Sequence, residues 1–374
     1  MDDQSMSVSR SPYWSAVERP VFIVGVERSG TTLLRSLLCA HSRFAVSPET
    51  HFMGLADTFG ARERTAPEDF EGFWSALERH LDARAIAIDL PRVRNLLDET
   101  GARDFRTVFA ALLAAQAERA GKLRVGEKTP GHEHYLDRLF DWFPEAKVLF
   151  VHRDPRGCAA SVLKAPWVQA QLRPEQFSAP LMRRTRLCHV AFKAEEWRAS
   201  QQIEQARVSD PRILSTAYEE LVTEPVAAIE RVCAFLGESF EAAMLKEKPT
   251  ALVDTSKRTL RWRDWTAEHE RRAASPIARD RLDRWREELT PTEIAVLESV
   301  CAEGMAAFGY APALSQPAHR RGHRRYEQVL WADRLERSGR HALRDLLRGR
   351  NGARAGLVSA AATEPALAAL AAVL

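Results

Sequence analysis

Cysteine is scarce in this sequence, and its few occurrences form no pattern. The five cysteines lie far apart, without a C-x-x-C pair and without histidines at the spacing of a metal site. This arrangement argues against a zinc site and against a disulfide framework, and it is typical of thiols in a reducing compartment. We therefore expect a cytoplasmic protein without a metal site.

Long apolar runs are also missing. No segment is long enough to span a bilayer, and the polar N-terminal segment, residues 1–18, lacks the apolar stretch of a secretory signal. The sequence thus predicts no transmembrane segment and no leader. Hydrophobic residues still make up 45% of the 374 residues, enough to bury a large core. The length is compatible with two domains and equally with one α/β domain that has helical insertions.

The third absence is that of a lysine in a glycine loop near the N-terminus. Residues 21–24 are apolar, as in a buried parallel strand, and leucines recur at helical spacing in residues 33–38. The loop between them matches the G-x-x-x-x-G-K-[ST] pattern of nucleotide hydrolases except for the lysine. Thr31 takes the place of that lysine, and Arg28 supplies a cation within the loop. The loop therefore predicts a site for a phosphate-like anion, but a poor ATPase.

The same loop resembles a known family. Residues 24–33, VGVERSGTTL, are similar to the 5′-phosphosulfate loop V-G-x-x-R-S-G-T-T-L of the sulfotransferases that use 3′-phosphoadenosine 5′-phosphosulfate (PAPS). The likeness extends in short blocks over roughly residues 19–310 and is closest to the tyrosylprotein and Golgi carbohydrate branch. The missing membrane anchor is typical of a soluble bacterial member. The resemblance implies that the donor is bound by Arg28, Ser29, Gly30, Thr31 and Thr32.

Glu49 is the candidate general base. In the resembling branch a glutamate follows the second strand, and Glu49, in SPETHF, stands at that place. The alternative for Glu49 is an acid at the start of a helix after Thr50, where it would interact with the helix dipole. His132 and His134 are rival bases, because the cytosolic branch of the family uses a histidine.

Lys128 is expected at the carboxyl edge of the sheet, where α/β proteins bind ligands. Residues 123–126 are predicted to form a strand, and Pro130 cannot lie inside a central strand. Without the resemblance, Lys128 is one surface lysine among several. The family has a lysine at this place, close to the sulfuryl group that is transferred.

A further strand is predicted at residues 147–151, followed by a helix from Pro155 to about residue 163. Arg153 and Ser161 match the family pattern V-x-R-x-P-R-x-x-x-x-S, whose arginine and serine hold the 3′-phosphate of the donor. The alternative for Arg153 is an ion pair with Asp154 at the strand end.

Two later segments complete the predicted donor site. Tyr218 begins a match to the family element Y-E-D-L-x-x-x-P and would lie near the adenine, although such a tyrosine is more often a half-buried core residue. Residues 254–265 are rich in arginine and tryptophan. By resemblance they form a basic flap over the nucleotide, but they lack the glycines of the cytosolic branch, and their composition also suits nucleic acid. The flap residues assigned to the donor are Ser256, Lys257 and Arg258.

The predicted fold is a mostly parallel, P-loop-like α/β sheet with helices on both faces and helical substrate-binding insertions. Its sulfotransferase domain would span residues 19–312, with the helical insert at about 51–120. Residues 313–374 form a basic helical extension, in which an amphipathic helix at 326–347 could dock on the body, pair subunits into a homo-oligomer or lie on a membrane.

As the resemblance implies, the chain would transfer a sulfuryl group from PAPS to a hydroxyl or amine of a small-molecule, glycan or peptide acceptor. Glu49 would take the acceptor proton, while Lys128 and Arg28 stabilise the developing charge without a metal. A phosphotransferase or NTPase of the same fold is the alternative enzyme. An adenine-nucleotide or nucleic-acid binding module is the non-enzymatic alternative, although no nucleic-acid partner is expected.

Overall fold

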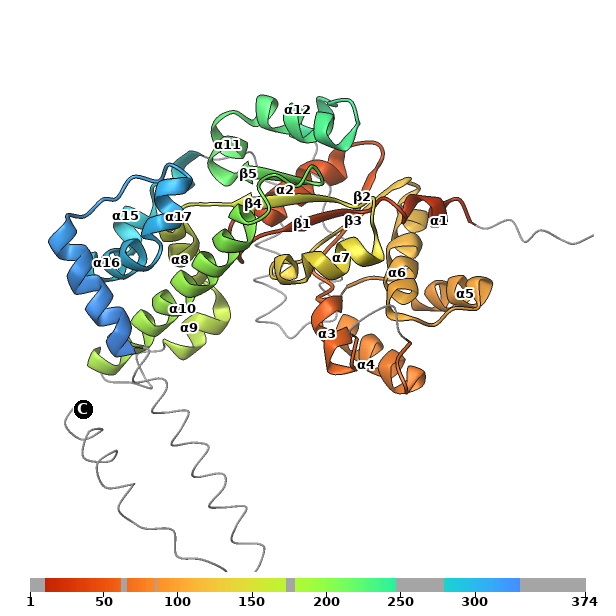
Figure 1. The fold of residues 1–374 in the computed structure, drawn as a ribbon, viewed down its shortest axis with the longest axis horizontal. Helices are drawn as coiled ribbons and strands as arrows, with labels where there is room; N and C mark the ends of the chain where they lie inside the picture. Colours follow the sequence, from red (N-terminus) through yellow and green to blue (C-terminus); the bar gives the residue numbers. More distant parts are fainter. Residues whose placement is uncertain (1–10, 62–65, 85, 173–178, 247–278, 330–374) are drawn as a thin grey trace, which may run out of the picture.

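The computed structural model describes residues 11–61, 66–84, 86–172, 179–246 and 279–329. Its centre is a five-stranded sheet in the order β2-β3-β1-β4-β5, and every neighbouring pair is parallel (Figure 1). The strands are β1 (Val21–Val24), β2 (Phe44–Ser47), β3 (Arg124–Lys128), β4 (Lys147–His152) and β5 (Ile213–Ala217).

Helices occupy most of the remaining described chain. They are α1 (Tyr13–Ala16), α2 (Thr31–Ala40), α3 (Phe52–Thr58), α4 (Phe70–Ala83), α5 (Leu90–Thr100), α6 (Phe105–Ala120), α7 (Leu136–Trp142), α8 (Pro155–Leu163), α9 (Pro166–Gln171), α10 (Ala179–Gln205), α11 (Tyr218–Thr223), α12 (Pro225–Leu236), α13 (Ala243–Lys246), α15 (Trp285–Glu288), α16 (Pro291–Val300) and α17 (Ala302–Ala307). Short 3₁₀ turns lie at η1 (His132–Tyr135) and η3 (Arg279–Arg281). A further helix covers residues 316–329.

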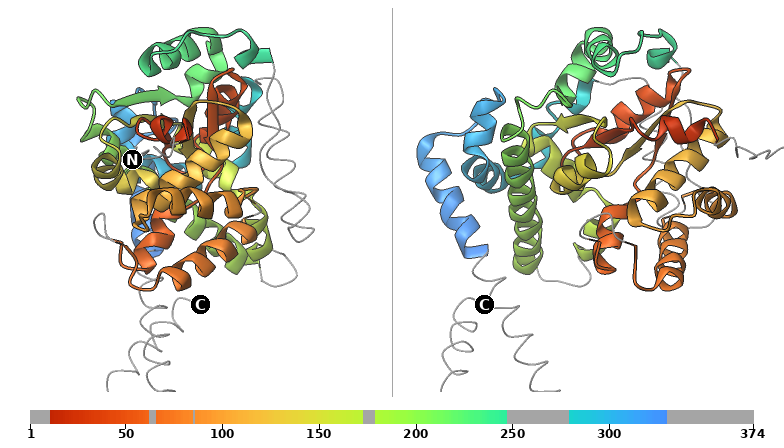
Figure 2. Two further views of the ribbon diagram at one scale, coloured as in Figure 1. Left: turned by 90° about the vertical axis from the view of Figure 1, so that its right-hand side faces the viewer. Right: turned by 45° about the vertical axis from the view of Figure 1, so that its right-hand side comes forward.

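The sheet is covered on both faces, as the apolar strand β1 requires. Val21 and Ile23 pack into a cluster with α2 and α12, whereas Phe22 and Val24 pack into a second cluster with α6 and α7. Successive strand residues point to opposite faces, so a central strand buried on both sides is apolar throughout. Figures 1 and 2 show α12 on one side of the sheet and α6 on the other.

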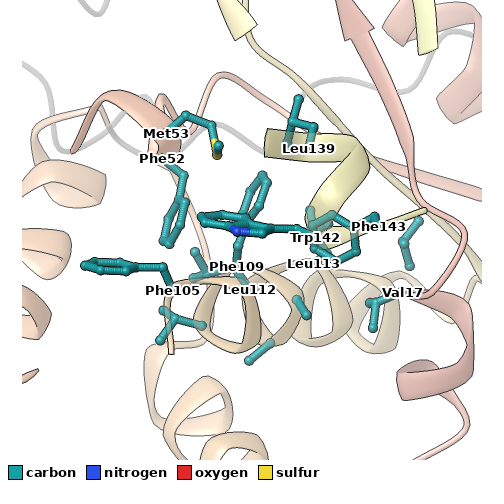
Figure 3. Close-up of a cluster of buried hydrophobic side chains, with 14 of the residues drawn as sticks. Val17, Phe52, Met53, Phe105, Phe109, Leu112, Leu113, Leu139, Trp142 and Phe143 are labelled. Carbon is teal, nitrogen blue, oxygen red and sulfur yellow. The ribbon is translucent and has the colours of Figure 1, made fainter. Parts of the chain in front are cut away.

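The helical insert expected at about 51–120 consists of α3 to α6. Its core is aromatic: the rings of Phe52 and Phe109 stack with centroids 4.7 Å apart, and Phe73 meets Phe52 edge-on at 6.0 Å. Figure 3 shows Trp142 and Phe143 completing this cluster over α6. Because Phe52 begins α3, the packing fixes the chain directly after Glu49 against the sheet.

A third apolar cluster joins α8, α10 and α16 to the first part of the C-terminal extension. In the helix at 316–329, Tyr326 and Val329 are buried in this cluster. Gly322 approaches α16 so closely that a Cβ there would lie 2.1 Å from the carbonyl oxygen of Ala295. This part of the extension is therefore packed into the body, and residues 330–374 lie outside the described chain.

The predicted α/β class with helices on both faces of a parallel sheet is confirmed. The expected strand at 123–126 runs two residues further, because Glu127 and Lys128 pair with Phe22 and Ile23 of β1. Among the described residues, no helix combines the length and apolar character needed to cross a bilayer.

Candidate active site

The predicted anion loop connects β1 to α2 at the carboxyl edge of the sheet, where the strand order reverses. Three of its residues have left-handed backbones: Gly25 (φ 131°), Arg28 (φ 76°) and Gly30 (φ 105°). For a bulky residue such as Arg28 this conformation costs on the order of 1–3 kcal/mol, and such strain is concentrated at functional sites.

The start of α2 has donors to offer to an anion. Within the described chain no side chain caps this helix, and its first turn carries no acidic residue. The hydroxyl of Ser29 is fully buried and has no hydrogen-bond partner among the described residues. An oxyanion at the helix N-terminus would satisfy these groups. The residues present therefore fit the phosphosulfate end of a donor.

Arg28, Ser161 and Arg153, which are far apart in the sequence, converge beside this loop. Nε of Arg28 donates to Oγ of Ser161 at 3.0 Å, and Nη1 of Arg153 lies 3.4 Å from the carbonyl oxygen of Arg28. Burial lowers the pKa of Arg28, and the charge of Arg153 lowers it further, against the opposite influence of Glu27 and Glu49. Two neighbouring guanidinium groups with a hydroxyl are suited to a second phosphate.

The guanidinium group of Arg153 does not pair with Asp154, the alternative considered from the sequence. Within the described chain it donates to the carbonyl oxygens of Arg28 and Arg281 and lies over the ring of Tyr218, 4.2 Å from its centroid. Asp154 instead caps α8 and binds Arg156 through both carboxylate oxygens. Arg153 is thus held by neutral groups and keeps its charge available for an anion.

Lys128 links the loop to Glu49. Its ammonium donates to Oγ1 of Thr32 at 3.1 Å and to Oε1 of Glu49. The side chain of Lys128 is 4% exposed, whereas that of Glu49 is 40% exposed and also lies 3.5 Å from Nε2 of His51. Burial favours the neutral acid, but Lys128 and His51 outweigh it and hold the pKa of Glu49 well below its usual value. Glu49 lies outside α3, so its partner is Lys128 and not the helix terminus.

The two rival histidines occupy different environments. His132 is buried, with Nδ1 3.1 Å from Oε2 of Glu127, and its ring faces Phe109. His134 is exposed on the 3₁₀ turn η1. A base must reach the acceptor, and of the three candidates only Glu49 contacts Lys128 among the described residues.

Three buried charged residues at this edge have no role in the sequence-based prediction. Glu133 accepts from the amide of Gly25 at 3.3 Å, Glu127 accepts from the amide of Thr50 at 3.0 Å, and Nζ of Lys193 lies 3.8 Å from Glu27. Glu127 could have been noticed, since it precedes Lys128 in the same strand. No local signal marks Glu133 or Lys193, because the loop residues that they contact, Gly25 and Glu27, are remote from them in the sequence. The predicted flap residues Ser256, Lys257 and Arg258 lie outside the described residues.

Comparison with known proteins bears on the family of this chain. A family model described as the sulfotransferase family matches residues 20–242. Nodulation protein NoeE of Sinorhizobium fredii is 28% identical over 302 residues, covering 78% of this chain and 66% of that protein. Protein-tyrosine sulfotransferase A of Caenorhabditis elegans is 22% identical over 300 residues, covering 79% of this chain and 68% of that protein. The chain thus spans about two thirds of the length of both relatives.

Among solved structures, the sulfotransferase domain of the olefin synthase from Synechococcus PCC 7002 aligns with a TM-score of 0.49 and 20% identity. The alignment covers 78% of this chain and 95% of that domain. The match of the family model extends over more than half of the sequence and includes the loop, Glu49, Lys128, Arg153 and Tyr218. The chain belongs to the sulfotransferase family.

Proposed function

We propose that the protein transfers a sulfuryl group from PAPS to a hydroxyl or amine of an acceptor, with Glu49 as general base. The observation that carries the proposal is the position of Lys128, whose ammonium contacts both Thr32 of the anion loop and Glu49. One cation therefore joins the place where the donor would bind to the carboxylate that would deprotonate the acceptor.

Donor recognition is assigned to two ends of the site. The loop residues 28–32 and the start of α2 would hold the 5′-phosphosulfate, and Arg153 with Ser161 would hold the 3′-phosphate. Their convergence through Arg28 supports this assignment. Tyr218, which packs on Arg153, would border the adenine, and Ser256, Lys257 and Arg258 would close over the nucleotide.

The chemistry follows from these positions. Glu49 takes the proton from the acceptor hydroxyl, and the acceptor oxygen forms a bond to sulfur in line with the departing phosphate oxygen. The sulfur–oxygen bond to the 5′-phosphate breaks, and the electron pair leaves with adenosine 3′,5′-bisphosphate. Lys128 and Arg28 are placed to stabilise the negative charge on the transferred group and on the leaving phosphate.

Lys128 can also regulate the strength of the base. As long as its ammonium contacts Glu49, that carboxylate has a low pKa and is a weak base. Anionic donor oxygens at the loop would compete for the same ammonium, because Thr32 lies within its reach. Glu49 would then lose part of its stabilisation as an anion, and its pKa would rise. Deprotonation of the acceptor would thus follow binding of the donor.

The acceptor is proposed to be a small molecule, a glycan or a peptide. A hydroxyl acceptor is consistent with the relative named a protein-tyrosine sulfotransferase. The proposed cytoplasmic location rests on the five cysteines, none of which forms a disulfide within the described chain. The extension beyond residue 313 is the proposed surface for a homo-oligomer.

A parallel thermal melt tests the donor. The protein is heated with adenosine 3′,5′-bisphosphate, with ATP and Mg²⁺, or with a short oligonucleotide. We expect selective stabilisation by the bisphosphate, by about 2.7 kcal/mol at a concentration of 100 times its Kd. Stabilisation by ATP alone would identify a phosphotransferase or NTPase, and stabilisation by the oligonucleotide alone would identify a nucleic-acid binding protein.

A further inference from the structure

Glu127 is a buried carboxylate that the proposed chemistry does not use. It is 1% exposed and lies at the end of β3, under the turn formed by residues 49–51. Its Oε1 accepts from the amide of Thr50 at 3.0 Å and from the hydroxyl of Thr50 at 2.8 Å. The hydroxyl of Thr129 also donates to Oε1, and Nδ1 of His132 lies 3.1 Å from Oε2.

These contacts favour the ionised form of Glu127. Burial alone favours the neutral acid, but His132, Thr129 and Thr50 outweigh it and hold the pKa of Glu127 below its usual value. A charged acceptor makes a stronger hydrogen bond to an amide than a neutral one does. The turn is therefore attached to β3 by charge-assisted bonds between buried groups.

The rest of the turn is fixed as firmly. His51 has a left-handed backbone with φ 48°, which a residue other than glycine adopts only when its surroundings impose it. Its amide donates to Oγ1 of Thr129 at 3.3 Å. On the other side, Nε2 of His80 lies 2.8 Å from the carbonyl oxygen of Thr50. The peptide groups that follow Glu49 are thus bound from both sides.

Glu127 and Lys128 hold the same turn from the two faces of one strand. Successive strand residues point to opposite faces, so the side chain of Lys128 reaches the carboxylate of Glu49 while that of Glu127 reaches the backbone of Thr50. We propose that Glu127 is a positioning residue: by binding the Thr50 amide and hydroxyl it holds the Glu49 carboxylate where Lys128 and the acceptor can meet it. This inference rests on the proposed role of Glu49 as base.

The test compares Glu127→Gln with the wild type on two phenols as acceptor probes. Tyrosine methyl ester is a weak acid that needs a base, whereas 4-nitrophenol is largely ionised at about pH 8 and needs little help. We expect turnover with the ester to fall about 10- to 100-fold, since small misplacements of a reacting group have effects of this size. Turnover with 4-nitrophenol and the Kd for adenosine 3′,5′-bisphosphate should change less than threefold. An equal loss with both phenols would show a merely structural role and overturn the proposal.

Glu204→Gln is the matched control. Glu204 is likewise buried and contacts a histidine, with Oε1 3.0 Å from Nδ1 of His152, but it supports β4 and β5 and not the turn at 49–51. The Glu204→Gln variant should be less stable than the wild type, and its turnover should change by the same factor with both phenols. Thr50→Val removes the hydroxyl bond to Glu127 and the acceptor of the Phe52 amide, and it keeps the bond from the Thr50 amide to Glu127. It should show the same difference between the phenols as Glu127→Gln at a few-fold size, and it decides the question if Glu127→Gln does not fold.

Hydrogen exchange gives a readout that needs no acceptor. The amides of residues 49–51 should exchange faster in Glu127→Gln or Thr50→Val, while those of α2 stay protected. Unchanged exchange at the turn in a folded variant would overturn the proposal. Glu49→Gln separates the two claims. If that variant keeps full turnover with the ester, the proposed base is wrong; if it loses turnover while Glu127→Gln does not, only the positioning role is wrong.

Discussion

The ring of Tyr218 lies where a side chain on Gly30 would stand: a Cβ at Gly30 would be 2.4 Å from Cδ2 of the ring. Gly30 is the N-cap of α2, and Tyr218 begins α11 and carries Arg153 on its ring. The anion loop and the proposed 3′-phosphate site are thus packed directly against each other. A substitution at Gly30 or Tyr218 should therefore affect binding at both the 5′-phosphosulfate end and the 3′-phosphate end of the donor.

Gly30→Ala should abolish donor binding. Its φ of 105° is unfavourable for alanine, and the ring of Tyr218 would have to move from under Arg153. Titration calorimetry with adenosine 3′,5′-bisphosphate measures the effect. Gly101→Ala is the control: it also has a positive φ, of 66°, but has open space around it, so it should cost about 1–2 kcal/mol of stability and leave binding intact. Normal binding by Gly30→Ala would place the donor elsewhere.

Arg153→Ala should weaken binding of adenosine 3′,5′-bisphosphate by about 1.5–3 kcal/mol, the range for a hydrogen bond to a charged group. Binding of adenosine 5′-phosphate, which lacks the 3′-phosphate, should hardly change. The two dissociation constants are measured side by side on the same variant. An equal loss for both ligands would mean that Arg153 acts only through Tyr218 and the loop carbonyls.

Glu49→Gln should keep its fold and its affinity for the bisphosphate but lose turnover about 10²- to 10⁴-fold with a weakly acidic acceptor, as expected on removal of a general base. Steady-state rates at saturating PAPS measure the loss. If Glu49 only favoured the dipole of a helix, the change would be limited to about 0.3–1 kcal/mol of stability.

The two histidines provide the comparison for Glu49. His134→Ala should be nearly neutral because His134 is exposed. His132→Ala should lower stability, because it removes the imidazole that lies 3.1 Å from the buried carboxylate of Glu127. Full turnover by Glu49→Gln together with a collapse of turnover in a folded His134→Ala or His132→Ala would assign the base to a histidine.

The Glu49–Lys128 contact should make stability depend on pH in the acid range. The pKa of Glu49 is lower in the folded protein than in the unfolded chain, so its contribution is fully present above about pH 5 and is lost as the pH falls through the folded pKa. The difference in unfolding free energy between the wild type and Glu49→Gln should therefore shrink as the pH is lowered. Urea titrations between about pH 7 and 3 measure it. A difference independent of pH would contradict the ion pair.

Truncation should divide the C-terminal extension into two parts. Removal of residues 330–374 should leave donor affinity unchanged, because the predicted donor residues all precede them. Removal from residue 316 onward also takes away Tyr326 and Val329, which are buried against α16. At about 1.5–3 kcal/mol for each buried side chain, this longer truncation should destabilise the protein by roughly 3–6 kcal/mol. Equal melting temperatures for both truncated proteins would contradict the observed packing.

The sequence by itself determined the strands, the anion loop and the order of the motifs. Local backbone preferences can be recognised from a few neighbouring residues. Examples are the apolar run at 21–24, the glycines of the loop and Pro155 at the start of α8. The observed bounds of β1 and α8 accordingly agree with the predicted ranges. The parallel sheet followed from strands separated by helical segments.

Only the tertiary structure decided which side chains meet. Arg28 and its partner Ser161 are 133 positions apart in the sequence, and Thr50 and its acceptor Glu127 are 77 positions apart. No local pattern predicts such contacts. From the sequence, Arg153 could pair either with Asp154 or with a ligand. In the structure Asp154 binds Arg156 and not Arg153. The ionisation of a buried carboxylate such as Glu127 likewise depends on neighbours brought by other elements, since burial alone would favour its neutral form.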